Sequence, residues 1–104
     1  MKYLMLVCSD ESIPFEPGHP VEPWVEENDR RGTRLEGDRL RSVDDVTTVR
    51  DGGRLIVDGP YAETKEQIAG YDVLECADLD EAVAIAAKHP MARFGSIEVR
   101  PFWT

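Results

Sequence analysis

Asp58 is the residue whose type and position most directly suggest acid–base chemistry. It follows the apolar run Leu55-Ile56-Val57 and precedes Gly59 and Pro60, which predicts a strand end before a tight turn. A partly buried carboxylate at such a place could act as a general base or orient a histidine. An aspartate at a turn also accepts hydrogen bonds from nearby backbone N–H groups, and this structural role is the alternative. Gly59 is a candidate ligand contact beside it.

Two imidazoles, His19 and His89, could move protons near neutral pH. His19 lies in a proline-rich loop before a predicted helix, where it could reach a cleft or be an exposed loop residue. His89 lies where a second helix ends, and a cation there is favoured by the helix dipole. We therefore expect His19, and not His89, to be the candidate proton shuttle.

Thr64, Lys65 and Arg100 are the candidate ligand anchors. Lys65 suits an anionic ligand and Thr64 a hydrogen bond, but the segment 63–68 could instead form one helical turn with solvated charges. Arg100 shares a strand face with Glu98, so it could pair within the sheet or present its guanidinium to a carboxylate ligand. We expect the ion pair.

Metal, nucleotide and thiol chemistry have little support in the sequence. Cys8 and Cys76 lie in apolar runs without C-x-x-C spacing, so we expect reduced core residues and no metal site. The run Asp51-Gly52-Gly53 predicts a hairpin turn and not a phosphate-binding loop. No cofactor is expected.

The elements that must position these residues follow from hydrophobic periodicity. Residues 2–8 predict a central strand, and residues 20–31 predict a helix that buries Trp24 and ends at Gly32. Residues 33–42 are expected to be extended but irregular. Residues 47–50 and 54–57 flank the predicted hairpin turn.

The second half of the chain repeats a strand, a helix and a strand. Residues 71–76 predict a strand, and Asp78 with Glu81 forms a capping box for a helix to about Lys88. That helix is expected to bury Leu79, Ala82, Val83 and Ala86, and a last strand covers residues 96–101. The order is β-α-β-β-β-α-β, or β-α-β-β-α-β if residues 33–42 form no full strand. Either predicts one α+β, ferredoxin-like domain over residues 1–104.

Composition narrows the function classes. The chain has 104 residues and a net charge of −9, which argues against nucleic-acid binding. The arginines at positions 30–41 alternate with acidic residues and are expected to be solvated. No apolar run is long enough to cross a bilayer and no signal region is visible, so a cytoplasmic protein is expected. The sheet face without helices needs a cover, with Tyr71, Phe102 and Trp103 near it, and a second copy of the chain is the expected one.

The run from Asp58 to Tyr71, DGPYAETKEQIAGY, resembles the motif of the DGPF-type branch of the YCII-related proteins, with Tyr61 in place of the usual Phe. The segments 78–82, 89–95 and 97–102 support the resemblance, which covers nearly the whole chain. It implies a homodimer of the dimeric α/β-barrel type with a small cleft in each subunit or near the dimer seam.

The wider superfamily carries a catalytic histidine on its first helix, and that position falls near Val21 here, with His19 the nearest histidine. Two functions remain open. The first is a small cofactor-free enzyme that performs acid–base chemistry on a small organic molecule near Asp58, with His19 as shuttle and Lys65 or Arg100 as anion anchor. The second is a non-catalytic ligand- or protein-binding module in transcriptional regulation, because members of this branch are often associated with sigma factors.

Overall fold

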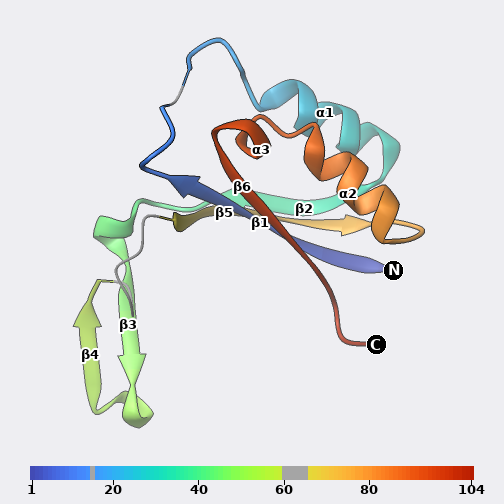
Figure 1. Ribbon diagram of the computed structural model, residues 1–104. Helices are drawn as coiled ribbons and strands as arrows, with labels where there is room; N and C mark the ends of the chain where they lie inside the picture. The colour runs from blue at the N-terminus through green and yellow to red at the C-terminus, as the bar shows by residue number, and fades with distance from the viewer. Residues whose placement is uncertain (15, 60–65) are drawn as a thin grey trace.

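The computed structural model describes residues 1–14, 16–59 and 66–104. Its main sheet is antiparallel and has the strand order β2-β5-β1-β6 (Figure 1). In chain order the strands of this sheet are β1 (Lys2–Asp10), β2 (Arg34–Arg39), β5 (Glu66–Glu75) and β6 (Gly95–Pro101). With one helical crossover between β1 and β2 and another between β5 and β6, this is the ferredoxin-like arrangement, and the predicted α+β fold is confirmed.

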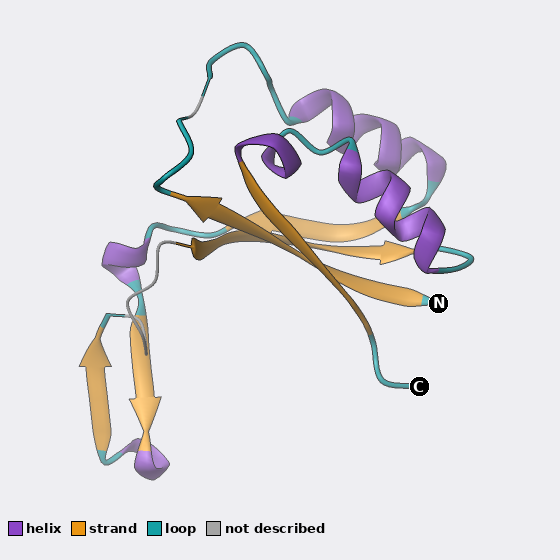
Figure 2. Ribbon diagram, viewed as in Figure 1, coloured by secondary structure: helices purple, strands orange, loops and turns teal. Residues whose placement is uncertain are grey.

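Three helices cover one face of the main sheet: α1 (Glu22–Arg31), α2 (Leu79–Ala87) and the short α3 (Met91–Phe94) (Figure 2). Strand β1 lies between β5 and β6 as predicted, and its residues alternate between the two faces. Tyr3, Met5 and Val7 are buried in the core under the helices, whereas Leu4 and Leu6 on the opposite face stay partly exposed.

Helix α1 begins two residues later than the sequence predicts, with Val21 as its N-cap. It ends at Gly32, whose φ of 73° is the left-handed conformation that glycine adopts most easily. Its buried residues are Trp24 and Asn28, and Trp24 Nε1 donates to Ile85 O at 2.9 Å. This bond ties α1 to α2 while it satisfies a buried indole N–H.

Helix α2 has the predicted N-cap but a different buried face. Asp78 Oδ1 accepts from Glu81 N at 2.9 Å, while Glu81 Oε1 accepts from the N–H of residue 77 instead of closing the box on Asp78. The buried residues are Ala82, Ile85 and Ala86, and the prediction for Leu79 and Val83 is wrong because both are 51% exposed. The buried face therefore runs through Ala82, Ile85 and Ala86. Helix α3 has no counterpart in the prediction.

Strands β3 (Thr47–Arg50) and β4 (Leu55–Asp58) form a separate two-stranded sheet, which we call the hairpin arm, residues 47–58. The glycine-containing turn between them is as predicted, but the arm does not join the main sheet. Figures 1 and 2 show it extending from one end of the sheet toward the side without helices. The radius of gyration is accordingly 15.1 Å, against about 13 Å for a compact domain of this length.

Two strands of the main sheet differ in part from the prediction. Residues 34–39 form the edge strand β2, which is extended as predicted and whose pairing with β5 shifts register between Arg34 and Glu36. Strand β5 begins at Glu66, so residues 66–68 are extended and the helical-turn alternative is wrong for them. Cys8 and Cys76 are both free and buried, as predicted. In the described part of the chain, no helix is long and apolar enough to cross a membrane.

Candidate functional site

A cavity of about 750 Å³ lies between the helix-covered face of the sheet and the start of α1. Its apolar walls include Val7 from β1, Val25 from α1 and Met91 from α3. Its polar lining comes from β1, the loop before α1, the start of α1, β2, β5 and the α2–α3 junction: Ser9, His19, Glu22, Arg34, Asp38, Arg39, Asp72 and His89. A volume in this range, with mostly apolar walls and a few polar groups, is typical of small-molecule sites.

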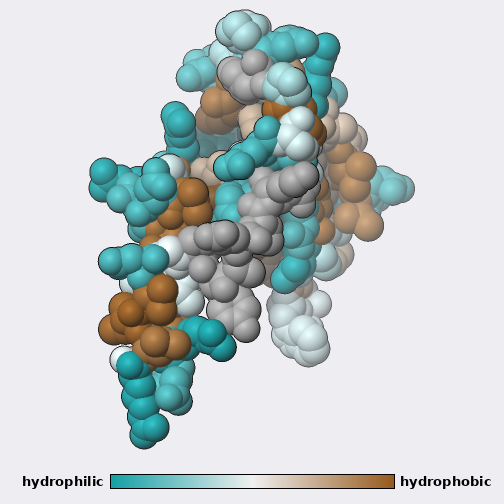
Figure 3. Space-filling view, turned by 60° about the vertical axis from the view of Figure 1, so that its left-hand side comes forward, coloured by the Kyte–Doolittle hydropathy of each residue, from teal (hydrophilic) through white to brown (hydrophobic). Residues whose placement is uncertain are grey.

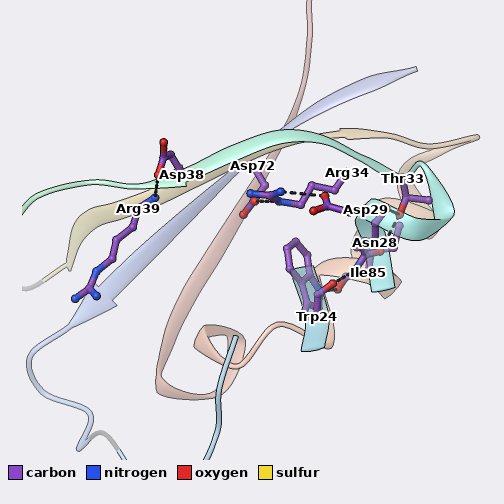
Figure 4. Close-up of polar contacts among 9 residues, drawn as sticks. All are labelled: Trp24, Asn28, Asp29, Thr33, Arg34, Asp38, Arg39, Asp72 and Ile85. Atoms are coloured by element: carbon purple, nitrogen blue, oxygen red, sulfur yellow. Dashed lines mark hydrogen bonds and ion pairs between the residues drawn. The ribbon is translucent and has the colours of Figure 1, made fainter. Parts of the chain in front are cut away.

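Arg34 and Asp72 form a buried ion pair at this cavity. Arg34 Nε donates to Asp72 Oδ1 at 2.7 Å, and Arg34 Nη1 donates to Asp29 Oδ1 at 2.9 Å (Figure 4). The two side chains of the pair are only 14% and 8% exposed. Burial opposes the charge of Arg34, but its hydrogen bonds to the two carboxylates outweigh this and raise its pKa. For Asp72, burial is the largest effect and raises the pKa of the carboxyl, while the hydrogen bond from Arg34 opposes that rise.

Gly37 makes room for this ion pair. A Cβ at that position would overlap Asp72 Oδ1 and would come within 2.7 Å of Tyr71 O and 2.8 Å of Arg34 Nη2. Since β2 and β5 pair Gly37 with Asp72, the glycine faces the carboxylate directly across the ladder. The missing side chain on β2 therefore allows the charged pair to lie against the sheet beneath the cavity.

His19 lines the cavity from the loop before α1. Its side chain is 37% exposed, with Nε2 3.7 Å from Glu16 Oε2, and its ring centroid lies 5.1 Å from that of Phe94. The imidazole is thus held between a carboxylate and an aromatic ring while it borders the cavity. Val21, the position that the resemblance associates with the superfamily histidine, borders the same cavity.

His89 is a second cavity residue, and the prediction that it is a helix-end cation is wrong. The residue is 6% exposed, and burial lowers its pKa to about 4. Its Nδ1 accepts from Met91 N at 3.0 Å, so the neutral ring carries its proton on Nε2. The ring packs edge-on to Trp24, with centroids 4.8 Å apart. Desolvation here outweighs the attraction of the helix dipole for a positive charge.

Arg39 is the cationic residue at the exposed side of the cavity. Its guanidinium makes no ion pair with any residue that the structure describes. Figure 4 shows the Arg39 and Asp38 side chains on opposite sides of β2, and the Arg39 N–H donates to Asp38 Oδ1 at 3.0 Å. A cation at a cavity that pairs with none of the described residues is a natural contact for an anionic ligand group.

The residues proposed from sequence are distributed over separate parts of the molecule. His19 lines the cavity, whereas Asp58 is exposed in β4 of the hairpin arm, paired with Thr47, and is not a lining residue. Gly59 closes the base of the arm: its N–H donates to Val46 O at 2.6 Å, and its carbonyl accepts from Thr48 Oγ1 at 2.6 Å.

The remaining predicted ligand contacts do not reach the cavity or cannot be placed. Arg100 pairs with Glu98 at 2.6 Å, so it forms an ion pair as expected, but within β6 and not across the sheet. Thr64 and Lys65 lie outside the described residues.

Four cavity residues were not identified from the sequence as parts of a site. Arg34 and Arg39 were counted among solvated arginines, which is wrong for Arg34, and Asp72 was not singled out within its strand. The run 71–76 contains two acidic residues, and Asp72 lies between apolar neighbours in its strand, where a charge requires a partner. His89 was assigned a structural role only, because its burial depends on Trp24 from α1.

The structure is thus that of a small α+β protein with a cavity between sheet and helices. The YCII-related domain family matches the chain over residues 1–104, and the chain therefore belongs to that family. It is 34% identical to "Uncharacterized protein R00369" of Rhizobium meliloti (strain 1021), over 97% of this chain and 91% of that one.

Among solved structures, the chain is similar to a dehydrochlorinase, the 5-chloro-2-hydroxyhydroquinone dehydrochlorinase (TftG) from Burkholderia phenoliruptrix AC1100 in complex with 2,5-dihydroxybenzoquinone. The match has a TM-score of 0.45 and 11% identity, and it covers 99% of this chain and 94% of that one. At that level the likeness says nothing about the chemistry of this chain.

Proposed function

We propose that this protein binds a small organic molecule in the cavity beside α1 and performs acid–base chemistry on it without a cofactor. The observation that carries the proposal is the cavity itself, whose volume of about 750 Å³ is bordered by His19, Arg39 and His89 around apolar walls. The imidazole of His19 can move a proton, the guanidinium of Arg39 can bind an anion, and the neutral ring of His89 can donate a hydrogen bond.

Each polar residue has a distinct role in this proposal. His19 takes a proton from the ligand or returns one to it, because it combines partial exposure with a border on the cavity. Arg39 binds an anionic group such as a carboxylate or phenolate. His89, neutral and with its proton on Nε2, donates a hydrogen bond and carries no charge. The ion pair of Arg34 and Asp72 holds β2 and β5 in position beneath the ligand.

The roles predicted for Asp58, Gly59, Thr64, Lys65 and Arg100 stay predictions. Asp58 as a base would have to act from the hairpin arm, which is a different part of the chain from the cavity. The simplest form of the proposal therefore assigns the proton transfer to His19 alone. Membership of the DGPF-type branch, suggested by the run 58–71, belongs to the same proposal.

We also propose that the protein is a homodimer that does not bind nucleic acid. The face of the main sheet without helices leaves Leu4, Leu6 and Tyr71 partly exposed, and Phe102 is 42% exposed after β6. A second copy of the same face would bury these residues by two-fold symmetry. The net charge of −9 would repel a phosphate backbone.

A non-catalytic binding module in transcriptional regulation is the second candidate function. It is favoured by one observation, the exposed apolar side chains of the hairpin arm, because exposed apolar patches are typical of protein-binding surfaces. A partner in transcription would use these side chains, whereas a ligand would use the cavity, so the two candidates make different predictions about where binding occurs.

Binding of three probes of similar size and different charge tests the proposed site: benzoate, phenol and benzamidine, each titrated into ¹⁵N-labelled protein. We expect benzoate to shift the amide signals of Val7, Gly37 and Met91 most strongly. If no probe moves these amides at millimolar concentration, the ligand site is wrong.

Proton transfer is tested separately, by hydrogen–deuterium exchange of a weak carbon acid such as acetylacetone in D₂O. Wild-type protein should accelerate the exchange, and His19→Gln should abolish the acceleration while leaving benzoate binding intact. Equal acceleration by the two proteins would remove His19 from the mechanism but would leave the binding site standing.

A further inference from the structure

The hairpin arm exposes large apolar side chains that its own chain does not cover. Val49 and Ile56 are each 62% exposed, Leu55 is 45% exposed and Val57 is 43% exposed. Figure 3 shows hydrophobic residues gathered on the arm, away from the body of the molecule. Every residue of β4 is exposed.

These side chains occupy both faces of the arm. Val49 lies opposite Ile56 in the strand pairing, so the two share one face, while Leu55 and Val57 fall on the other. A two-stranded hairpin is at best marginally stable alone in water, and one with apolar residues on both faces needs a cover. The exposed fractions of these side chains show that residues 1–14, 16–59 and 66–104 do not supply that cover.

The arm and the uncovered sheet face point to the same side of the molecule. In Figures 1 and 2 the helices lie on one side of the main sheet, and the arm descends on the other. That other side also carries Leu4 and Leu6 and, near the end of the sheet from which the arm leaves, Ile68, which is 51% exposed. A single partner placed against the sheet would therefore meet the arm as well.

Charge and symmetry favour a second copy of this chain as that partner. The tip of the arm, residues 50–54, carries two arginines and one aspartate in a chain whose net charge is −9, so the tip is locally basic. An acidic body attracts such a tip. In a two-fold dimer each arm would reach the other subunit. The apolar residues of the arm and those of the uncovered sheet face would then be buried together, with no free edge left for further association.

We propose that the hairpin arm clasps a second copy of the chain and buries the Val49 and Ile56 face against it. The inference rests on the homodimer proposed above and adds to it a specific contact outside the main sheet. The arm is then part of the quaternary structure and gains its stability there.

Sedimentation velocity over a range of protein concentrations tests the contact, with Val49→Thr/Ile56→Thr compared with wild type. Threonine keeps the strand propensity, so the arm retains its local conformation while it loses apolar surface. The matched control is Leu79→Thr/Val83→Thr, which removes two apolar side chains, each 51% exposed, from the outer face of α2. We expect the arm variant to raise the dimer dissociation constant about tenfold or more, and the control to leave it unchanged.

Hydrogen–deuterium exchange of the wild-type arm gives a second measurement that needs no variant. Amides of β3 and β4 should become more protected as the dimer fraction rises with concentration. If wild type dimerises but these amides exchange as fast as a free peptide, and the arm variant dimerises normally, the arm contact is wrong and the homodimer stands. If wild type stays monomeric at about 100 µM by sedimentation, the homodimer and the arm contact are both wrong. The benzoate titration is a separate test of the cavity.

Discussion

Arg34 Nε lies 2.7 Å from Asp72 Oδ1, and this contact joins the edge strand β2 to the central strand β5 beneath the cavity. A second bond from Arg34 Nη1 to Asp29 continues it to α1. One guanidinium thus connects three elements that border the proposed ligand site. Because its side chain is only 14% exposed, the connection is shielded from the competition of water that weakens surface ion pairs.

Replacing Asp72 by Asn should lower the free energy of unfolding by about 2 kcal/mol, since the guanidinium of Arg34 loses its ion pair and keeps only a hydrogen bond to a neutral amide oxygen. Urea denaturation followed by circular dichroism measures the loss. Asp45→Asn is the matched control, because it removes the partner of Arg41, which is 88% exposed, and should cost at most about 1 kcal/mol. Equal losses in the two variants would mean that burial adds nothing to the pair.

Gly37→Ala should destabilise the protein by about 1–3 kcal/mol and should disturb the cavity, because the new methyl group overlaps Asp72 Oδ1 and crowds the backbone at Tyr71 O. The comparison variant is Gly70→Ala, whose Cβ would meet its nearest neighbour, Asp38 O, at 3.0 Å. We expect Gly37→Ala to have the lower melting temperature of the two. The reverse order would show that the ion pair moves aside easily.

Most of the main sheet could be predicted from hydrophobic periodicity, but the segment that supplies its edge strand β2 could not. The strongest hairpin signal in the sequence, two apolar runs around Asp51-Gly52-Gly53, belongs to the arm. The weaker segment 34–39 is the strand that joins the sheet. Local propensity identifies a hairpin but not what it packs against, because packing is decided by contacts distant in sequence.

The candidate site was less predictable, for a related reason. His19 could be selected because an imidazole before a helix is conspicuous in the sequence. The pair of Arg34 and Asp72 is separated by 38 positions, and only the register of β2 on β5 brings them together. The neutral state of His89 depends on Trp24 and on a helix, α3, that the pattern did not predict.

Arg39→Gln should weaken benzoate binding about fivefold to tenfold, while phenol binding should change little. The guanidinium is exposed at the cavity and free of ion pairs with described residues, so its loss removes an attraction that only the anionic probe has. Chemical-shift titration gives both affinities. Arg100→Gln is the control, because Arg100 is occupied by Glu98 outside the cavity and should not affect either probe. A similar loss for phenol would mean that Arg39 shapes the cavity and is not an anion anchor.

His89 should remain neutral until the pH falls to about 4, and this gives the protein a pH-dependent stability that one variant can isolate. The folded pKa is depressed below the ordinary value of 6.5, so the unfolded chain binds a proton in this interval while the native state does not. The contribution of the neutral ring to stability is therefore complete above pH 6.5 and is lost as the pH falls toward 4.

Urea denaturation of wild type and of His89→Gln, each over a range of pH, measures this contribution. Subtracting the unfolding free energies of the variant from those of wild type cancels the contribution of the carboxylates, which titrate in both proteins. We expect the difference to grow by about 3 kcal/mol between pH 4 and 6.5. A flat difference, or an imidazole proton signal that titrates near 6.5 by NMR, would mean that the ring is protonated within the fold. His89 would then be the helix-end cation that the sequence suggested, and could not serve as a neutral donor to the ligand.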